Sequence, residues 1–231
     1  LIKLAVYESK QNFGFNALIG PVVKLWHIGF KGAHVPTDAQ IKAKMGLTNP
    51  DDVVLDDANQ TVFLTKKGME LDLGGIAKGY IADRIRDLWR AYDVRAGIIN
   101  LGGNVLFVNS SPKRASGEWI LGVQDPKKKR GDNLTTATVH ECSAVTSGTY
   151  ERFLEINGKK YHHIIDPKTG YPVQTHVAGV TLFTRDSVQA EIECKRLFFA
   201  GGSIPGWKND KAGRYGAIFV YDDDSIERIG V

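Results

Sequence analysis

The chain is poor in cysteine and has no long apolar run. Only Cys142 and Cys194 occur among its 231 residues, too few for a disulfide framework or a cysteine-rich metal cluster. No stretch approaches the roughly 18 consecutive apolar residues that a membrane-spanning helix requires. We therefore expect two free thiols and a globular fold that does not depend on disulfides.

A concentrated basic surface is also missing. The formal net charge is +4, but the 30 Lys and Arg residues are scattered among 26 acidic ones. Residues 127–130 form a basic run, and the Pro126 and Gly131 that flank it predict an exposed loop. This pattern does not favour nucleic acid as a partner, although a net positive chain suits an anionic small ligand.

Hydrophobic patterns of both kinds are present. A Thr37–Gln40 capping box starts a short helix that ends near Gly46, and apolar spacing predicts longer helices over 76–92 and 188–200. Residues 12–26 are punctuated by Gly and Pro, which predicts a structured loop and turn. Short apolar runs predict strands at 53–55, 61–64, 98–101, 105–108, 119–123, 136–139, 179–183 and 217–221. The mixture predicts an α+β fold whose mostly antiparallel sheet is packed with helices.

Two glycine pairs lie beside predicted elements, and the first of them has both a structural and a functional interpretation. Gly74 and Gly75 precede the strongest predicted helix, where unpaired N–H groups could hold a pyrophosphate. A tight strand-to-helix turn would need the same glycines. The pair in Asn100–Asn104 lies between two predicted strands and is typical of a hairpin turn.

The segment 147–172 concentrates His, Asp, Glu, Arg, Thr and Tyr around turn residues. Within it, His163 and Asp166 are either functional groups or, respectively, a structural His and a turn-forming Asp before Pro. His162 precedes His163 in an extended segment, so we expect its side chain to face the opposite side, at the surface.

Taken together and in order, five motifs resemble the ApbE family. They are an element from Phe15 to Trp26 with Asn16 where the family usually has Asp, Gly-Gly-Ile-Ala-Lys-Gly-Tyr at 74–80, Asn-Leu-Gly-Gly-Asn at 100–104, Thr-Ser-Gly-Thr-Tyr-Glu-Arg at 146–152 and His-Ile-Ile-Asp-Pro-Lys-Thr-Gly at 163–170. The resemblance extends from about residue 14 to 201. It implies an ApbE-like, T-fold related architecture, with residues 1–231 as a single flavin-transferase domain that lacks the N-terminal part of the family domain.

The resemblance also implies an activity. The family binds FAD, uses Mg²⁺, and transfers FMN to a Thr hydroxyl of a partner protein, releasing AMP. His163 and Asp166 would lie beside the pyrophosphate, where either could orient or deprotonate the hydroxyl. The acceptor would carry an Asp-x-x-Ala-Thr type of motif. The implied flavin contacts are Gly14, Phe15, Asn16, Gly74, Tyr80 and the backbone of Ile165.

The implied metal site departs from the family pattern. Where the family has an Asp and a Thr four residues later, this chain has Glu191 and Lys195. The resemblance implies Glu191 and the carbonyls of Ala77 and Cys194 as ligands, whereas Lys195 has no acceptor atom and cannot be an ordinary ligand. Lys195 either forms an ordinary i,i+4 pair with Glu191 or places its ammonium where the metal would be.

Further expectations rest on the family alone. The protein would be extracytoplasmic, on the outer face of a bacterial membrane. It would associate with the membrane only through an N-terminal lipid anchor outside this sequence. Two alternatives to the transferase remain: an FAD-binding protein without turnover, favoured by Lys195, and a Mg²⁺-dependent FAD pyrophosphatase in which water replaces the Thr hydroxyl.

Overall fold

The computed structural model describes all 231 residues, which form two compact units. The first unit comprises Leu1–Gly75 and Thr149–Gln174, and the second comprises Ile76–Gly148 and Thr175–Val231. Each unit is thus built from two separate stretches of the chain. The assignment of residues 1–231 to one family domain stays a prediction.

The first unit is built from short helices and two hairpins around a small aromatic core. Trp26, which is fully buried, packs with Val22 and Ile41, and its indole N–H donates to the carbonyl of Gly170 at 2.8 Å. The indole therefore joins the two stretches of chain that make up this unit. Its elements are α1 (Ile2–Lys10), α2 (Gly20–Trp26), α3 (Asp38–Met45), the 3₁₀-helix η1 (Pro50–Asp52), β1 (Val53–Asp56) paired with β2 (Thr61–Leu64), and β8 (Phe153–Ile156) paired with β9 (Lys159–His162).

Two helices of this unit differ from the sequence-based expectation. The segment predicted as loop and turn contains helix α2, which starts with Gly20-Pro21. Proline fits the first turn of a helix because the N–H that it lacks has no partner there. Helix α1 was not predicted at all. The capping box of α3 is confirmed, with Thr37 Oγ1 accepting from the Gln40 N–H at 3.3 Å.

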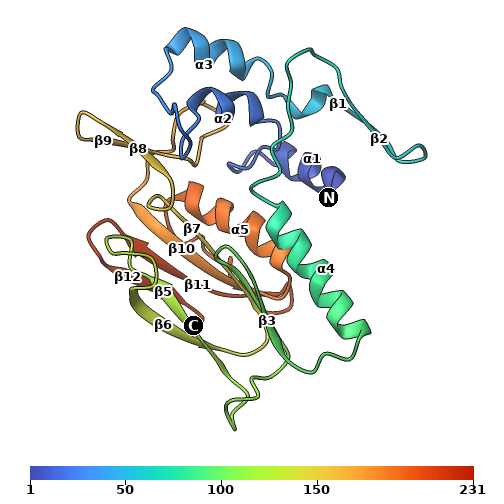
Figure 1. The fold of residues 1–231 in the computed structure, drawn as a ribbon, viewed down its shortest axis with the longest axis vertical. Coiled ribbons are helices and arrows are strands. Elements are labelled where there is room, and N and C mark those ends of the chain that lie inside the picture. Colours follow the sequence, from blue (N-terminus) through green and yellow to red (C-terminus); the bar gives the residue numbers. More distant parts are fainter. The chain divides into compact units, whose positions relative to one another are not determined.

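The second unit is a six-stranded sheet with two helices and an additional hairpin (Figure 1). The strand order is β12-β11-β10-β7-β4-β3, and every neighbouring pair is antiparallel. This confirms the α+β class with an antiparallel sheet. The elements are α4 (Ala77–Ala91), β3 (Gly97–Leu101), β4 (Asn104–Val108), β5 (Trp119–Gln124) paired with β6 (Asn133–Val139), β7 (Ser143–Gly148), β10 (Val177–Thr184), α5 (Ser187–Ala200), β11 (Arg214–Tyr221) and β12 (Ile226–Ile229).

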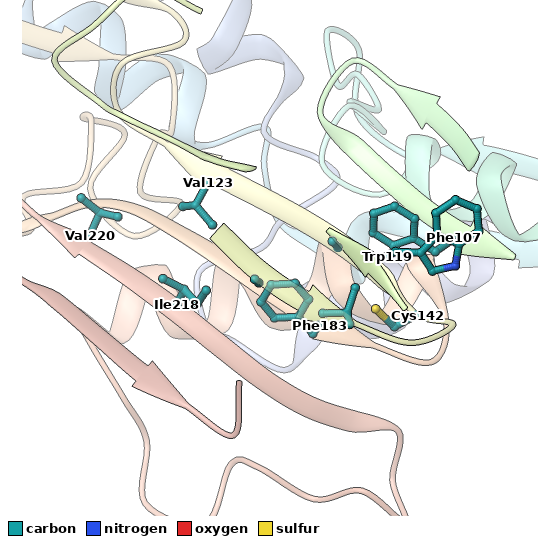
Figure 2. Close-up of a cluster of buried hydrophobic side chains, with 10 residues drawn as sticks. Phe107, Trp119, Val123, Cys142, Phe183, Ile218 and Val220 are labelled. Atoms are coloured by element: carbon teal, nitrogen blue, oxygen red, sulfur yellow. The ribbon is translucent and has the colours of Figure 1, made fainter. Parts of the chain in front are cut away.

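The two faces of this sheet are covered differently. Side chains alternate between the faces along each strand. In β4, Leu106 and Val108 pack with Ala82 of α4, whereas Phe107 lies between them in the chain and stacks on Trp119 of the β5–β6 hairpin. Figure 2 shows the hairpin-side core, in which Trp119, Val123 and their neighbours pack with Phe183 and Ile218. Helix α5 contacts β7 and β10 on the helix-covered side.

A glycine sets the close approach of α4 to α5. A Cβ on Gly79 would lie 2.4 Å from the carbonyl oxygen of Ser187 and 2.8 Å from Cγ of Glu191. Any larger residue would force the two helices apart. None of the helices has the length and apolar character needed to span a membrane.

Candidate functional site

A cluster of ionised groups is buried in the second unit where α4, α5 and β4 meet. Its centre is Glu191 of α5, only 1% exposed. Its Oε2 accepts from Nζ of Lys195 at 2.7 Å, and its Oε1 lies 3.0 Å from Nζ of Lys78. Asn104 donates its amide N–H to the same Oε1 at 3.0 Å. Both carboxylate oxygens are therefore engaged by donors.

A second hydrogen bond fixes the orientation of the Asn104 amide. The hydroxyl of Ser187, the first residue of α5, donates to Oδ1 of Asn104 at 2.8 Å. Because the amide oxygen is used in this way, the NH₂ group faces Glu191. Ser187 and Asn104 are both buried, so this arrangement is shielded from competing water.

The surroundings keep Glu191 ionised. Burial by itself raises the pKa of a carboxyl group, but the charges of Lys195 and Lys78, with hydrogen bonds from Lys195 and Asn104, lower the pKa of Glu191 to about 2. The cluster thus contains one carboxylate and two ammonium groups, which leaves one positive charge in excess.

The amino end of α5 is held in place by an acidic side chain of α4. Asp83 accepts from the backbone N–H groups of Ser187 and Val188, each at 2.8 Å. Asp83 thereby caps a helix that begins about a hundred residues later in the chain. Burial raises the pKa of Asp83, although these two hydrogen bonds and the charge of Arg86 oppose that effect.

The predicted metal ligands do not fit a divalent cation in this arrangement. The predicted set offers a single carboxylate, that of Glu191, and no group of three or more His, Cys, Asp or Glu side chains adds to it. At Glu191, a divalent ion about 4 Å from one ammonium would be repelled by roughly 8 kcal/mol at an effective dielectric constant of about 20. The roles of Glu191 and of the Ala77 and Cys194 carbonyls as ligands stay predictions without support from this geometry.

The residues predicted to contact the flavin divide between the two units. Tyr80 belongs to the second unit, where its ring lies under the guanidinium of Arg84 at 5.5 Å. Gly14, Phe15, Asn16, Gly74 and Ile165 belong to the first unit.

The loop that contains Asn16 is well anchored. Asn16 donates to the carbonyl of Thr48 at 2.8 Å and accepts from the N–H of Leu18 at 2.8 Å. Gly14, with φ of 114°, adopts a backbone conformation that favours glycine. Phe15 is buried, at 6% exposure. The loop therefore has a defined conformation, as expected for a binding segment.

Gly74 lies in an exposed turn, where its N–H donates to Oδ1 of Asp72 at 2.8 Å. A Cβ there would lie 2.9 Å from the same oxygen, so glycine permits this close turn. This geometry agrees with a tight turn before α4, although no strand precedes it, because β2 ends at Leu64.

His163 and Asp166 lie on one tight segment of the first unit. Nδ1 of His163 is 3.2 Å from the carbonyl oxygen of Arg152. The carboxylate of Asp166 accepts from the N–H of Lys168 at 2.8 Å, and its backbone N–H donates to the carbonyl of Tyr171 at 2.7 Å. Asp166 therefore serves the turn that it begins, as the structural interpretation predicts.

The expectation that His162 lies at the surface is wrong. Its side chain is buried, and Nε2 is 2.9 Å from the carbonyl oxygen of Val173. Strand β9 ends at His162, and the chain then turns back, with Ile165 bridged to Pro172, which brings the Val173 carbonyl to the His162 ring. Alternation along a strand does not predict which later segment packs against a side chain.

The sequence alone did not predict the contacts made around α5 by four residues, which are Lys78, Asp83, Asn104 and Ser187. Lys78 and Asn104 lie inside motifs quoted for the family resemblance, which was the available signal. Their convergence on Glu191 depends on tertiary structure, and no local spacing predicts it.

Comparison with known proteins identifies the family. The family model described as ApbE family matches residues 1–219, and the chain belongs to this family. The chain is 47% identical over 191 residues to a protein of Klebsiella pneumoniae named FAD:protein FMN transferase, covering 83% of this chain and 58% of that protein. It is 38% identical over 213 residues to a protein of the same name from Treponema pallidum, covering 87% and 59%.

Solved structures agree with the fold. The ApbE protein of Thermotoga maritima matches with a TM-score of 0.83 and 30% identity, over 98% of this chain and 74% of that one. The apo flavinyl transferase ApbE of Pseudomonas stutzeri has a TM-score of 0.76 over 99% of this chain and 70% of that one, but its 22% identity supports the fold alone. The chain spans less than two thirds of the length of the Klebsiella and Treponema relatives.

Proposed function

We propose that this chain transfers FMN from FAD to the hydroxyl of a Thr in a partner protein and releases AMP. The observation that carries the proposal is the family match over residues 1–219, together with 47% identity to a relative named for this reaction. FAD is the substrate in this proposal, and the partner supplies the acceptor, a Thr in an Asp-x-x-Ala-Thr type of motif.

The proposed reaction is a phosphoryl transfer. The Thr oxygen forms a bond to the flavin-side phosphorus, the bond from that phosphorus to the bridging oxygen breaks, and AMP leaves with the electron pair. The hydroxyl proton must pass to a base. Such reactions depend mainly on positioning and on neutralising the charge of the phosphates.

We assign the base to His163. A backbone carbonyl can only accept, so a ring nitrogen that pairs with the carbonyl of Arg152 must carry the proton. In the neutral ring Nε2 is then the basic nitrogen. Asp166 is the weaker choice because its carboxylate accepts from its own turn. Asp166 is accordingly assigned the task of shaping the segment that presents His163.

The proposed flavin contacts are Gly14, Phe15, Asn16, Gly74, Ile165 and Tyr80. Within the first unit, the anchored loop around Asn16 offers a defined binding segment, and within the second unit Tyr80 offers an aromatic ring, both of which suit a large planar ligand. No step is assigned to Mg²⁺, because the Glu191 cluster does not fit it. A location on the outer face of a bacterial membrane, through a lipid anchor, is proposed on the family resemblance alone.

The test is to incubate the purified chain with FAD and a peptide carrying the acceptor motif, and to follow AMP release and peptide mass. An FMN-sized mass increase with equimolar AMP is expected. AMP without labelled peptide would instead identify an FAD pyrophosphatase. Retained FAD without AMP would identify a flavin-binding protein, and either result would overturn the transferase proposal.

His163→Gln tests the assignment of the base. Loss of general-base catalysis is expected to lower the rate by about 10²- to 10⁴-fold. His176→Gln is the matched control, because the His176 side chain is 97% exposed. Equal rates for the two variants would remove His163 from the proposed role.

A further inference from the structure

The buried cluster around Glu191 contains a lysine in a place where a divalent cation does not fit. Lys195 follows Glu191 by one helical turn, and its side chain is only 17% exposed. An exposed i,i+4 pair would be ordinary surface chemistry. This pair is shielded, and its carboxylate, 2% exposed, is additionally bound by Lys78 and Asn104.

The two lysines differ in their access to solvent. Lys78 is 43% exposed, whereas Lys195 is largely covered. An ammonium group has three N–H donors, and Glu191 takes one from Lys195. Each lysine thus retains donors for a further acceptor, and the excess positive charge of the cluster favours an anion as that acceptor.

The surrounding geometry fixes the position of the Lys195 charge. Glu191 is held by Asn104, which Ser187 orients, and α5 is capped by Asp83. The close approach at Gly79 leaves no room for the Glu191 stem to move toward α4. A positioned ammonium can neutralise phosphate charge as a point charge, which is a known use of lysine.

We propose that the Lys195 ammonium, anchored on Glu191, takes the place of a divalent cation in this chain, so that the diphosphate of FAD is bound without a metal. This inference rests on the proposed function, because it takes FAD as the ligand. It concerns how the diphosphate is held, and it is independent of whether transfer to a protein follows.

The experiment measures FAD affinity by calorimetry in excess EDTA and in excess MgCl₂. The wild type is expected to bind equally in both. Lys195→Met is expected to bind about tenfold or more weakly in both, which corresponds to about 1.4 kcal/mol. Lys195→Thr is expected to bind weakly in EDTA and to recover about tenfold in MgCl₂. Lys113→Met, at an exposed position of the same unit, is the matched control and should equal the wild type.

Direct metal binding gives a second readout. Binding of Mn²⁺ is measured by electron paramagnetic resonance. The wild type should not bind Mn²⁺, whereas Lys195→Thr should bind it. Mn²⁺ binding to the wild type, a tenfold gain in its FAD affinity on adding MgCl₂, or wild-type affinity in Lys195→Met would each overturn the inference.

The outcomes separate this inference from the proposed function. Metal-independent FAD binding without AMP release would remove the transferase and leave the role of Lys195 intact. FMN transfer that requires Mg²⁺ would support the transferase and overturn the proposed role of Lys195. If FAD is not bound at all, inorganic pyrophosphate replaces it as the probe in EDTA, and equal affinity of the wild type and Lys195→Met for pyrophosphate would overturn the inference.

Discussion

The two faces of the six-stranded sheet bury different kinds of side chain. The face under the β5–β6 hairpin is covered by an apolar cluster that includes Phe107, Trp119 and Phe183 (Figure 2). Under α4 and α5, the buried set also contains Asp83, Arg86 and Glu191. One sheet therefore supports an apolar core on one side and a network of charges on the other.

This difference separates stability from function within one unit. Burial of apolar surface stabilises a fold in proportion to area, whereas buried ion pairs are often no better than apolar replacements. The hairpin face should thus carry most of the stability. The helix face should tolerate less rearrangement of charge, because its groups position Lys195 for the anion that we propose.

The largest expected effect comes from truncating the apolar face. Phe183→Ala removes a ring that is 1% exposed and should lower the free energy of unfolding by about 3–5 kcal/mol, measured by urea denaturation. FAD affinity of the folded fraction should not change. Phe63→Ala is the control, because Phe63 is 64% exposed and should change stability by no more than about 0.5 kcal/mol. Similar losses for the two variants would contradict the contrast between faces.

The next largest effect concerns the contact between α4 and α5. Gly79→Ala places a Cβ against the Ser187 carbonyl and should cost about 1–3 kcal/mol in urea denaturation. FAD affinity should fall with it, since the shift displaces Glu191. Gly46→Ala is the control: its φ is −62°, and the nearest atom to the new Cβ is 3.5 Å away. A stability of Gly79→Ala equal to that of this control would show that the helices can separate at no cost.

Local features of the sequence predicted local structure well. The α3 capping box needs only Thr37 and Gln40, and the apolar period of residues 76–92 predicted α4 to within a residue at each end. Four of the six strands of the antiparallel sheet, β3, β4, β10 and β11, lie where short apolar runs between turn signals predicted them, but β7 and β12 were not predicted. Helix α2 was not predicted, because Gly20 and Pro21 were interpreted as helix-breaking residues. Both in fact occupy the first turn of this helix.

The site was predictable only in part, because its contacts join distant parts of the chain. The Glu191–Lys195 pair follows from helical spacing and was predicted as one of two alternatives. The bond from Asn104 to Glu191 spans 87 residues, and the cap from Asp83 to Ser187 spans 104. Neither has a local signature, since each depends on how the helices and β4 pack.

A smaller effect should follow from removing the cap of α5. Asp83→Ala leaves the N–H groups of Ser187 and Val188 without their acceptors and should cost about 1–2 kcal/mol. Chemical denaturation gives the cost, and hydrogen exchange should show faster exchange at these two amides. Asp87→Ala, at an exposed position of the same helix, is the control. Unchanged amide protection in Asp83→Ala would rule out the cap as their source of stability.

The smallest expected effect uses the two thiols, one in the apolar core of the hairpin face and one at the centre of α5. Burial raises the pKa of Cys142 to about 12 and that of Cys194 to about 11, from an ordinary value of 9.0. Each thiol stays protonated in the folded chain up to about pH 10 and ionises near pH 9 once unfolded, so the unfolded state binds fewer protons above about pH 8.

The contribution of the two thiols to stability should therefore be constant below about pH 8 and fall as the pH rises, by about 0.4 kcal/mol per thiol at pH 9. Urea denaturation from pH 7 to 9 measures this fall in the free energy of unfolding. Cys142→Ala should remove the part of the fall that comes from one thiol. A disulfide reagent at pH 8 should label neither thiol in the native chain and both in urea. Rapid labelling of the native chain at Cys142 would show that the hairpin opens readily. The contrast between a closed apolar face that provides stability and a charged face that binds the ligand would then fail.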